Sequence, residues 1–339
     1  MVDLGNWKSV LKADSTDWLL EEDNPSVRYF ALIQLLDKPQ NDPEVAAAKK
    51  AIMTAGAVPK ILSKQSSDAC WEAADEYYTA KYRGTSWQLL ILSELSADGK
   101  DERIRKACEF ILEASQDLES GGFSLWHSVK MGGGRHNGVI PCLTGNMVYS
   151  LIRLGLLEDE RVHRGVDWIV RYQRFDDGDS RAPNVWPYEN LVSGCFGKHS
   201  CHMGVVKSLK ALAEIPTNKQ SKAVNDAIAQ GAEYMLKHHI HKRSHNLTKV
   251  SKPGWPHFGF PLMYQDDVLE VLGILTKLGY RDERMQEAID LVISKQDTTG
   301  RWNLENTFNG RFQTNIEQKG LPSKWITLNA LTVLKRFYS

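Results

Sequence analysis

The chain has 339 residues, and its 42 Lys and Arg residues balance its 42 Asp and Glu residues, so its formal net charge is zero. A neutral chain gives no electrostatic reason to bind nucleic acid or an anionic membrane, and it favours a small or neutral partner. The first residues lack the features of a secretory signal, and no apolar run approaches the roughly 20 residues that span a bilayer. We therefore expect a cytoplasmic protein that binds a small molecule, with its oligomeric state left open.

Five cysteines are scattered along the chain, and an odd, scattered set argues against a disulfide framework. They are Cys70, Cys108, Cys142, Cys195 and Cys201. In a reducing compartment we expect them to be thiols or metal ligands.

The predicted elements are helices throughout, because few stretches alternate β-branched and polar residues. The segment NPSVRYFALIQLL from Asn24 is helical, but residues 1–80 are the least regular part of the chain. Beyond them, strongly apolar helical runs begin about sixty residues apart, at Thr85, Cys142, Cys201, Tyr264 and Lys324. Helices this apolar are expected to be buried on more than one side.

Three amphipathic helices with a common beginning follow the runs from Thr85, Cys142 and Tyr264. They are DERIRKACEFILEASQD from Asp101, DERVHRGVDWIVRYQRF from Asp159 and DERMQEAIDLVISKQDT from Asp282. Each opens with acidic residues, which suit the positive end of a helix, and carries apolar residues at steps of three and four.

An apolar run and the amphipathic helix after it form a helical hairpin, and about six such hairpins fill the chain. A hairpin cannot bury its apolar face alone, so the hairpins must stack in an open solenoid or close into a ring. Because the hairpins are few and long, we expect a ring. The sequence thus predicts one all-α domain over residues 1–339.

A short motif follows the amphipathic helices. QDTTGRW contains Gln296, Gly300 and Trp302 in a Gln-x-x-x-Gly-x-Trp pattern, and related residues occur in QDLESGGF and QRFDDG. A glutamine amide can satisfy backbone groups at a helix end, while glycine permits a tight turn. Over roughly residues 60–339 the chain resembles the prenyltransferase and squalene cyclase superfamily. The resemblance implies an α/α toroid, with inner and outer helix rings around a central cavity.

The stretch GKHSCHMG is similar to part of a zinc site in this superfamily. In protein prenyltransferase β subunits, an Asp-x-Cys pair and a histidine one repeat later hold a catalytic zinc. By resemblance, Cys142 occupies the cysteine position and His199 the histidine position, whereas Ile140 replaces the aspartate. Cys201, His202 and Asp266 are alternatives for the missing ligand.

The repeat itself gives a second argument for this site. It places Cys142 and Cys201 at matching heights on adjacent inner helices. Thiolate and imidazole are ligands that zinc prefers, and three protein ligands leave a fourth position for catalysis. We therefore predict a zinc site formed by Cys142, His199, Cys201 and His202, with the choice between the two histidines open. The alternative is that these cysteines are small buried apolar groups and the histidines are hydrogen-bonded.

Two acids begin the apolar helix in MYQDDVLE. The stretch resembles the Asp-x-Asp-Asp motif of squalene-type cyclases, with Tyr264 at the first aspartate position. Asp266 and Asp267 are candidates for a ligand, a general base or a proton donor, and a simple helix cap is the alternative.

Basic residues precede two of the apolar helices. Arg135 and His136 follow three glycines before Cys142, and Arg135 resembles a diphosphate-binding residue of prenyltransferases. A guanidinium there suits an oxyanion, although a solvated surface loop is the alternative. Under the ring architecture, Lys81, Tyr82, Arg83 and Lys324 face the same rim.

Three functions remain open. The first is a zinc-dependent hydrolase of a small ester, such as a phosphoester, in which the metal lowers the pKa of bound water. The second is a prenyltransferase or terpene cyclase acting on an isoprenoid in an aromatic cavity, with Trp87, Trp255 and Trp325 as examples of its lining. The third is a ligand-binding toroid with a structural metal. The sequence favours the first, because the acidic cyclase motif is incomplete.

Overall fold

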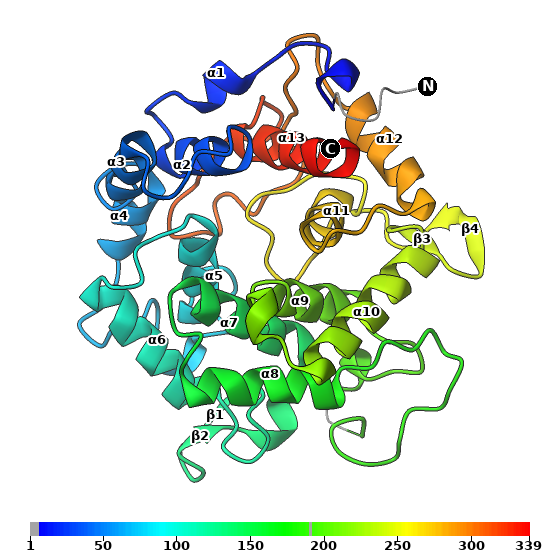
Figure 1. Ribbon diagram of the computed structural model, residues 1–339. Helices are drawn as coiled ribbons and strands as arrows, with labels where there is room; N and C mark the ends of the chain where they lie inside the picture. The colour runs from blue at the N-terminus through cyan, green and yellow to red at the C-terminus, as the bar shows by residue number, and fades with distance from the viewer. Residues whose placement is uncertain (1–6, 190–191) are drawn as a thin grey trace. The chain divides into compact units, whose positions relative to one another are not determined.

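The helices group into two compact units in a computed structural model, which describes residues 7–189 and 192–339 (Figure 1). Unit 1 comprises Met1–Ile61, Met235–Leu262 and Asp266–Ser339, and unit 2 comprises Leu62–Tyr234 and Met263–Gln265. The prediction of a single domain over residues 1–339 concerns how these units pack together, and it stays a prediction.

Unit 2 contains three apolar helices in a row, with amphipathic helices packed on them. α7 lies between α5 and α9, while α6 packs on α5 and α8 packs on α7 (Figure 1). The helices are α5 (Thr85–Glu94), α6 (Glu102–Ser115), α7 (Pro141–Arg153), α8 (Glu160–Tyr172), α9 (His202–Leu212) and α10 (Lys222–Lys237), the last of which continues into unit 1. Every residue of α7 from Pro141 to Ile152 is buried, whereas α6 buries one face only. The predicted hairpins and their two kinds of helix are therefore confirmed in this unit.

Unit 1 repeats this arrangement with helices from both ends of the chain. α13 contacts α2 and α11, α3 packs on α2, and α12 packs on α11. The helices are α1 (Thr16–Leu19), α2 (Pro25–Gln34), α3 (Pro43–Ala51), α4 (Ala57–Leu62, which ends in unit 2), α11 (Val268–Lys277), α12 (Gln286–Ser294) and α13 (Lys324–Tyr338). The all-α class predicted from the sequence is confirmed.

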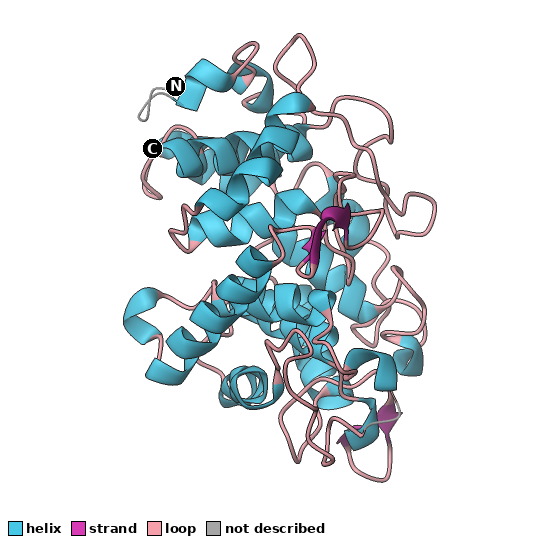
Figure 2. Ribbon diagram, turned by 90° about the vertical axis from the view of Figure 1, so that its right-hand side faces the viewer, coloured by secondary structure: helices cyan, strands magenta, loops and turns pink. Residues whose placement is uncertain are grey.

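Strands in the described residues are confined to two short hairpins (Figure 2). β1 (His127–Ser128) pairs with β2 (Gly133–Gly134), and β3 (Lys242–Arg243) pairs with β4 (Asn246–Val250). Among the helices of the described chain, none combines the length and the apolar character needed to cross a bilayer.

The aspartate of each repeated Asp-Glu-Arg sequence is an N-cap residue. Asp101, Asp159 and Asp282 are N-cap residues, and each side chain accepts a hydrogen bond from the backbone N–H of the arginine two positions later, at 2.8–2.9 Å. The guanidinium of the same arginine also donates to the carboxylate. An aspartate there satisfies one of the N–H groups that the first turn leaves unpaired. The third repeat differs, because Asp282 caps a 3-10 turn before α12.

The glutamines that end these helices act on backbone groups, as the sequence predicts. Gln116 Nε2 donates to the carbonyl oxygens of Gly121 and Arg161. Gln296 accepts from Lys12 N through Oε1 and donates to Val10 O through Nε2. The glycine of the motif, Gly300, has φ of +72°, a conformation that residues with a Cβ rarely adopt.

His241, a buried histidine of unit 1, makes the free energy of unfolding depend on pH. It is 4% exposed, and its Nδ1 has no hydrogen-bond partner within the described residues. Burial lowers the pKa of His241 below its ordinary value of 6.5, and the adjacent Lys242 adds to this effect. Below about pH 6.5 the unfolded chain therefore binds more protons than the folded chain.

We expect the free energy of unfolding to fall as the pH is lowered from 7 to 5, and to fall less in His241→Gln. Denaturant unfolding at both pH values measures the difference. His245→Gln is the matched control, because His245 is exposed. An unchanged pH dependence in His241→Gln would contradict the prediction.

Candidate functional site

The segment before α5 carries a tyrosine in an unusual backbone conformation. Tyr82 has φ of +65°, which is costly for a residue with a large side chain. Side chains of the first turns of α5 hold the segment in place: Gln88 Nε2 donates to Tyr82 O at 2.8 Å, and Trp87 Nε1 donates to Tyr78 O at 2.9 Å. The segment is therefore fixed against α5 before any ligand binds.

Three aromatic rings surround the ammonium group of Lys81, and we call Tyr78, Trp87 and Tyr264 the aromatic cage. Lys81 Nζ lies 4.7 Å from the ring centroid of Tyr78, 5.7 Å from that of Trp87 and 4.4 Å from that of Tyr264. The Tyr78 and Trp87 rings are 4.9 Å apart, and the Trp87 and Tyr264 rings are 6.1 Å apart. The negative faces of aromatic rings attract a cation at such distances. The cage is thus a place where unit 2 stabilises positive charge.

Tyr264 belongs to unit 2, and polar contacts hold its segment there. Gln265 Nε2 donates to Tyr82 Oη at 3.1 Å, and Asn146 Nδ2 of α7 donates to Met263 O at 3.1 Å. The ring of Tyr264 also stacks on that of Tyr82, with centroids 6.5 Å apart.

Three buried amide oxygens around this segment lack hydrogen-bond donors in the described residues. They are Gln88 Oε1, Asn146 Oδ1 and Gln265 Oε1. A buried acceptor without a donor costs about 1–3 kcal/mol, so such oxygens recruit water or a ligand donor. Asn146 is 2% exposed and Gln88 is fully buried.

One of the predicted site residues, Tyr264, is part of the cage. Burial raises the pKa of Tyr78 far above its ordinary value, and the nearby side chains of Cys142 and Tyr264 raise it further. The Tyr78 phenol is therefore neutral at physiological pH. Cys142 itself is buried in the first turn of α7, 8% exposed.

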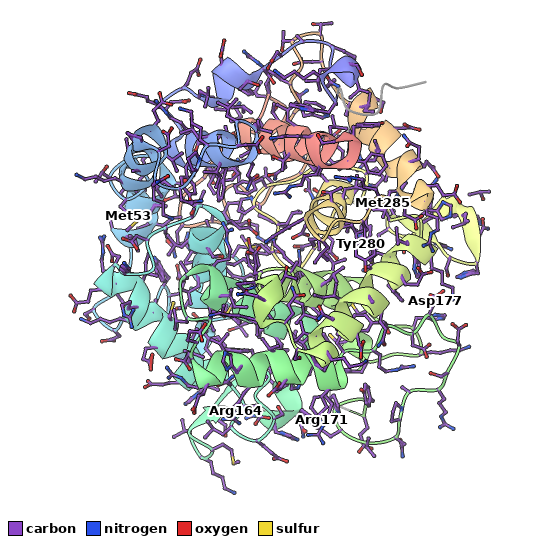
Figure 3. All side chains as sticks on the ribbon, viewed as in Figure 1. Met53, Arg164, Arg171, Asp177, Tyr280 and Met285 are labelled. Atoms are coloured by element: carbon purple, nitrogen blue, oxygen red, sulfur yellow. The ribbon has the colours of Figure 1, made fainter. Side chains whose placement is uncertain are left out.

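The predicted zinc site of Cys142, His199, Cys201 and His202 stays a prediction. Within residues 7–189 and 192–339, no group of three or more His, Cys, Asp or Glu side chains is placed to hold a metal. His199 is exposed, and its Nδ1 lies 2.6 Å from Asp177 O, on the long loop between α8 and α9 where Figure 3 labels Asp177. His199 was predicted as a ligand by its resemblance to the zinc histidine of prenyltransferases, and that role stays a prediction.

Cys201 and His202 mark the beginning of α9. Cys201 is the N-cap residue but its side chain makes no capping hydrogen bond, and the ring of His202 lies 5.2 Å from that of Tyr234. Cys195, which the sequence argument did not select, lines a small cavity with Cys201 and His199. Burial raises the pKa of Cys195 to about 11, and Cys201 adds to this, so Cys195 is a neutral thiol at pH 7.

Arg135 and His136 contact nearby aromatic and acidic side chains. His136 Nδ1 lies 2.9 Å from Asp117 Oδ2, and its ring stacks on Trp186 with centroids 4.1 Å apart. Arg135 is exposed, and its guanidinium lies 5.9 Å from the Trp126 ring centroid. These contacts fit the surface-loop alternative for both residues.

The two acids before α11 differ in role. Asp267 is the N-cap: its Oδ1 accepts from Glu270 N and its Oδ2 from Gly259 N, both at 2.8 Å. Asp266 is 5% exposed, and both acids belong to unit 1. The capping alternative therefore accounts for Asp267, while a catalytic role for Asp266 stays a prediction.

Asp267→Ala is expected to lower the free energy of unfolding by about 1–2 kcal/mol, because α11 loses its cap and Gly259 N loses its acceptor. Asp267→Asn retains an acceptor oxygen and should recover at least half of this loss. Equilibrium denaturation measures both values. Equal losses in the two variants would show that the carboxylate charge, rather than capping, is what matters.

The cage residues could have been found in the sequence. The stretch YYTAKYRGTSW, from Tyr77 to Trp87, is dense in aromatic and basic residues directly before an apolar helix. Asn146 and Gln88 also stand out as amides in otherwise apolar helices. No pattern in the sequence indicates that these residues lie near Tyr264, which is more than a hundred positions further along the chain.

No family model matches the chain, and no curated protein sequence matches it. Solved structures with similar folds include a protein from Actinoplanes, at 15% identity, covering 99% of this chain and 100% of that one with a TM-score of 0.45. A type II terpene cyclase variant from Scytonema, in complex with its substrate geranylgeranyl dihydroxybenzoate, is 15% identical, with coverage of 94% and 87% and a TM-score of 0.42. An unsaturated glucuronyl hydrolase specific for heparin is 12% identical, with coverage of 96% and 86% and a TM-score of 0.46.

The TM-scores of these three matches all lie below 0.5, and their identities are 12–15%.

Proposed function

We propose that the protein is an enzyme acting on an isoprenoid diphosphate, with unit 2 providing the site where positive charge develops. The observation that carries the proposal is the aromatic cage around Lys81 Nζ, at 4.4 Å from the nearest ring centroid. Ring faces that hold an ammonium ion can hold a carbocation equally well, because both are attracted by the same quadrupole.

The proposed reaction begins when the allylic C–O bond breaks. The electron pair leaves with the diphosphate, and the carbon chain becomes an allylic cation. Lys81 lies half-buried on a flexible four-carbon stem, so in this mechanism its ammonium moves off the rings to pair with the departing diphosphate and leaves the ring faces to the cation. The cation then loses a proton or is attacked by a nucleophile, as in a terpene cyclase or a prenyltransferase.

Neutral phenols suit this chemistry. Burial keeps Tyr78 protonated, so the cage offers ring faces and does not trap the cation with an oxyanion. The unused oxygens of Gln88, Asn146 and Gln265 can accept hydrogen bonds from water or from a hydroxyl of the second substrate.

The test is incubation of the purified protein with farnesyl and geranylgeranyl diphosphates, with measurement of released diphosphate and of organic products by mass spectrometry. Release of diphosphate with formation of a cyclic or transferred product is the expected result. Chromogenic phosphate and carboxylate esters, with and without a chelator, test the zinc-dependent hydrolase predicted from the sequence. Chelator-sensitive ester hydrolysis with no consumption of either diphosphate would overturn the proposal. Tight binding without turnover would instead favour a ligand-binding protein.

A further inference from the structure

Two of the five cysteines differ from the others in their surroundings. Cys70, Cys108 and Cys142 are buried, whereas Cys195 and Cys201 are partly exposed. Both partly exposed cysteines belong to unit 2, and both lie between α8 and α9. Thiols that solvent can reach are the ones that oxidants modify, while buried thiols are protected. These two thiols are therefore the candidates for a redox modification.

The burial of the chain between the two cysteines follows a symmetric pattern. Phe196 and Ser200 are buried, each 8% exposed, whereas residues 197–199 between them are exposed. The chain thus leaves the interior after Phe196 and returns to it at Ser200. The two cysteines are the residues just outside these buried positions, one at each end of the loop. A compact loop of this form has its two ends close together.

Contacts with the rest of unit 2 hold both ends of this loop. The Phe196 ring packs edge-on against that of Tyr188, with centroids 6.0 Å apart. Ser200 N donates to Asp176 O at 2.8 Å, and Asp176 N donates to Ser200 Oγ at 2.9 Å. Ser200 O also accepts a hydrogen bond from Tyr234 Oη at 2.9 Å. The fold therefore sets the position of each end of the loop.

Cys195 and Cys201 line the same small cavity. Its volume is about 10 Å³, roughly what one water molecule needs, so the residues around it lie close to one another. Burial raises the pKa of Cys195, and Cys201 is near enough to raise it further. The Cys201 side chain makes no capping hydrogen bond to α9, so α9 does not hold its sulfur in place. Two neighbouring, partly exposed thiols are the groups from which a disulfide forms.

We propose that Cys195 and Cys201 are a redox-active pair that hydrogen peroxide oxidises to a reversible disulfide. One thiol attacks the peroxide: an S–O bond forms, the O–O bond breaks, and the leaving oxygen takes up the thiol proton and departs as water. The product is a sulfenic acid. The second thiol attacks this sulfur, so that an S–S bond forms and the hydroxyl departs with the second proton as water. Two thiols and one peroxide thus give one disulfide and two waters, and a dithiol reductant reverses the change.

The disulfide links the loop between α8 and α9 covalently to the beginning of α9, because Cys201 is the N-cap residue of that helix. It closes residues 195–201 into a ring that includes His199. Since the thiolate is the form of cysteine that binds a metal, oxidation and metal binding exclude each other at Cys201. The pair uses residues of unit 2 only, and it does not depend on the proposed isoprenoid chemistry.

The test is peptide mapping of the full-length protein after treatment with a chelator and then with hydrogen peroxide. Lys198 lies between the two cysteines, so trypsin separates them into different peptides, residues 182–198 and residues 199–207. We expect mass spectrometry to find these peptides joined by a disulfide, and dithiothreitol to separate them. The link should form at least about tenfold faster than any link to one of the three buried cysteines, because burial protects a thiol from the oxidant.

Serine variants assign the link to the pair. Cys195→Ser and Cys201→Ser should each abolish it and leave the remaining thiol as a sulfenic acid, which dimedone labels. Cys70→Ser is the matched control, because it makes the same change at a buried cysteine and should leave the link unchanged. Three results would overturn the proposal: no linked peptides, a link that forms only between two protein molecules, or a sulfinic acid on one thiol while the other stays reduced. Failure of isoprenoid turnover leaves these outcomes unaffected.

Discussion

Tyr264→Leu is expected to reduce kcat/KM for an isoprenoid diphosphate by about thirtyfold or more. Leucine keeps much of the apolar volume but removes the ring face that lies 4.4 Å from Lys81 Nζ. A cation–π contact in a desolvated site is worth about 2 kcal/mol, which corresponds to roughly a thirtyfold change in rate. Steady-state diphosphate release measures the effect.

Tyr264→Phe is the critical comparison, because phenylalanine keeps the ring and loses only the hydroxyl. We expect its kcat/KM to stay within about threefold of the original protein, since the ring face supplies most of the attraction. Tyr280→Leu is the matched control, because it makes the same chemical change in unit 1, just after α11 (Figure 3). We expect it to leave turnover unchanged. If Tyr264→Leu and Tyr264→Phe lose activity equally, the ring face is not the source of stabilisation.

Gly145→Ala is expected to lower the free energy of unfolding by about 2 kcal/mol or more. Gly145 lies where α7 crosses α9, and a Cβ there would come within 2.5 Å of Lys207 C and 2.7 Å of Ser208 N. These are backbone atoms, so no side-chain rotation relieves the clash and the two helices must separate. Chemical denaturation followed by circular dichroism measures the loss.

Gly273→Ala is the matched control for this change. Gly273 is also a mid-helix glycine, in α11, but a Cβ there would lie 3.9 Å from Val333 Cγ2, which is an ordinary contact. Alanine should therefore stabilise α11 by about 0.5–1 kcal/mol through its better helix propensity. A loss of stability in Gly273→Ala as large as that in Gly145→Ala would contradict the close-crossing explanation.

Separating α7 from α9 should also disturb the site. Cys142 and Asn146 are in α7, and Asn146 Nδ2 holds Met263 O next to Tyr264. Gly145 therefore links the packing of two helices to the position of one cage ring.

The sequence was informative about features that depend on neighbours within a few positions. The aspartates of the Asp-Glu-Arg repeats cap their helices, because the acceptor and its N–H donor are two residues apart. Apolar periodicity separated buried helices such as α7 from one-sided helices such as α6, because burial follows the face of each helix. The third repeat was expected to resemble the others, but its first turn is a 3-10 helix.

The sequence was less informative about the site, because the site depends on contacts between distant segments. Tyr264 was selected from the sequence, and its ring lies 4.4 Å from Lys81 Nζ in the cage. His199 was predicted as a zinc ligand by resemblance, and this stays a prediction. It follows an irregular loop whose geometry no periodicity describes, and its Nδ1 lies 2.6 Å from Asp177 O.

By itself, the sequence determined the helices, their caps and their buried faces, since these follow from short-range hydrogen bonding and the 3.6-residue period. Only the tertiary structure decided which side chains meet. The cage forms because Gln265 and Asn146 bring a segment near residue 264 to the beginning of α5. Contacts of this kind depend on the packing of the whole unit, and no local pattern encodes them.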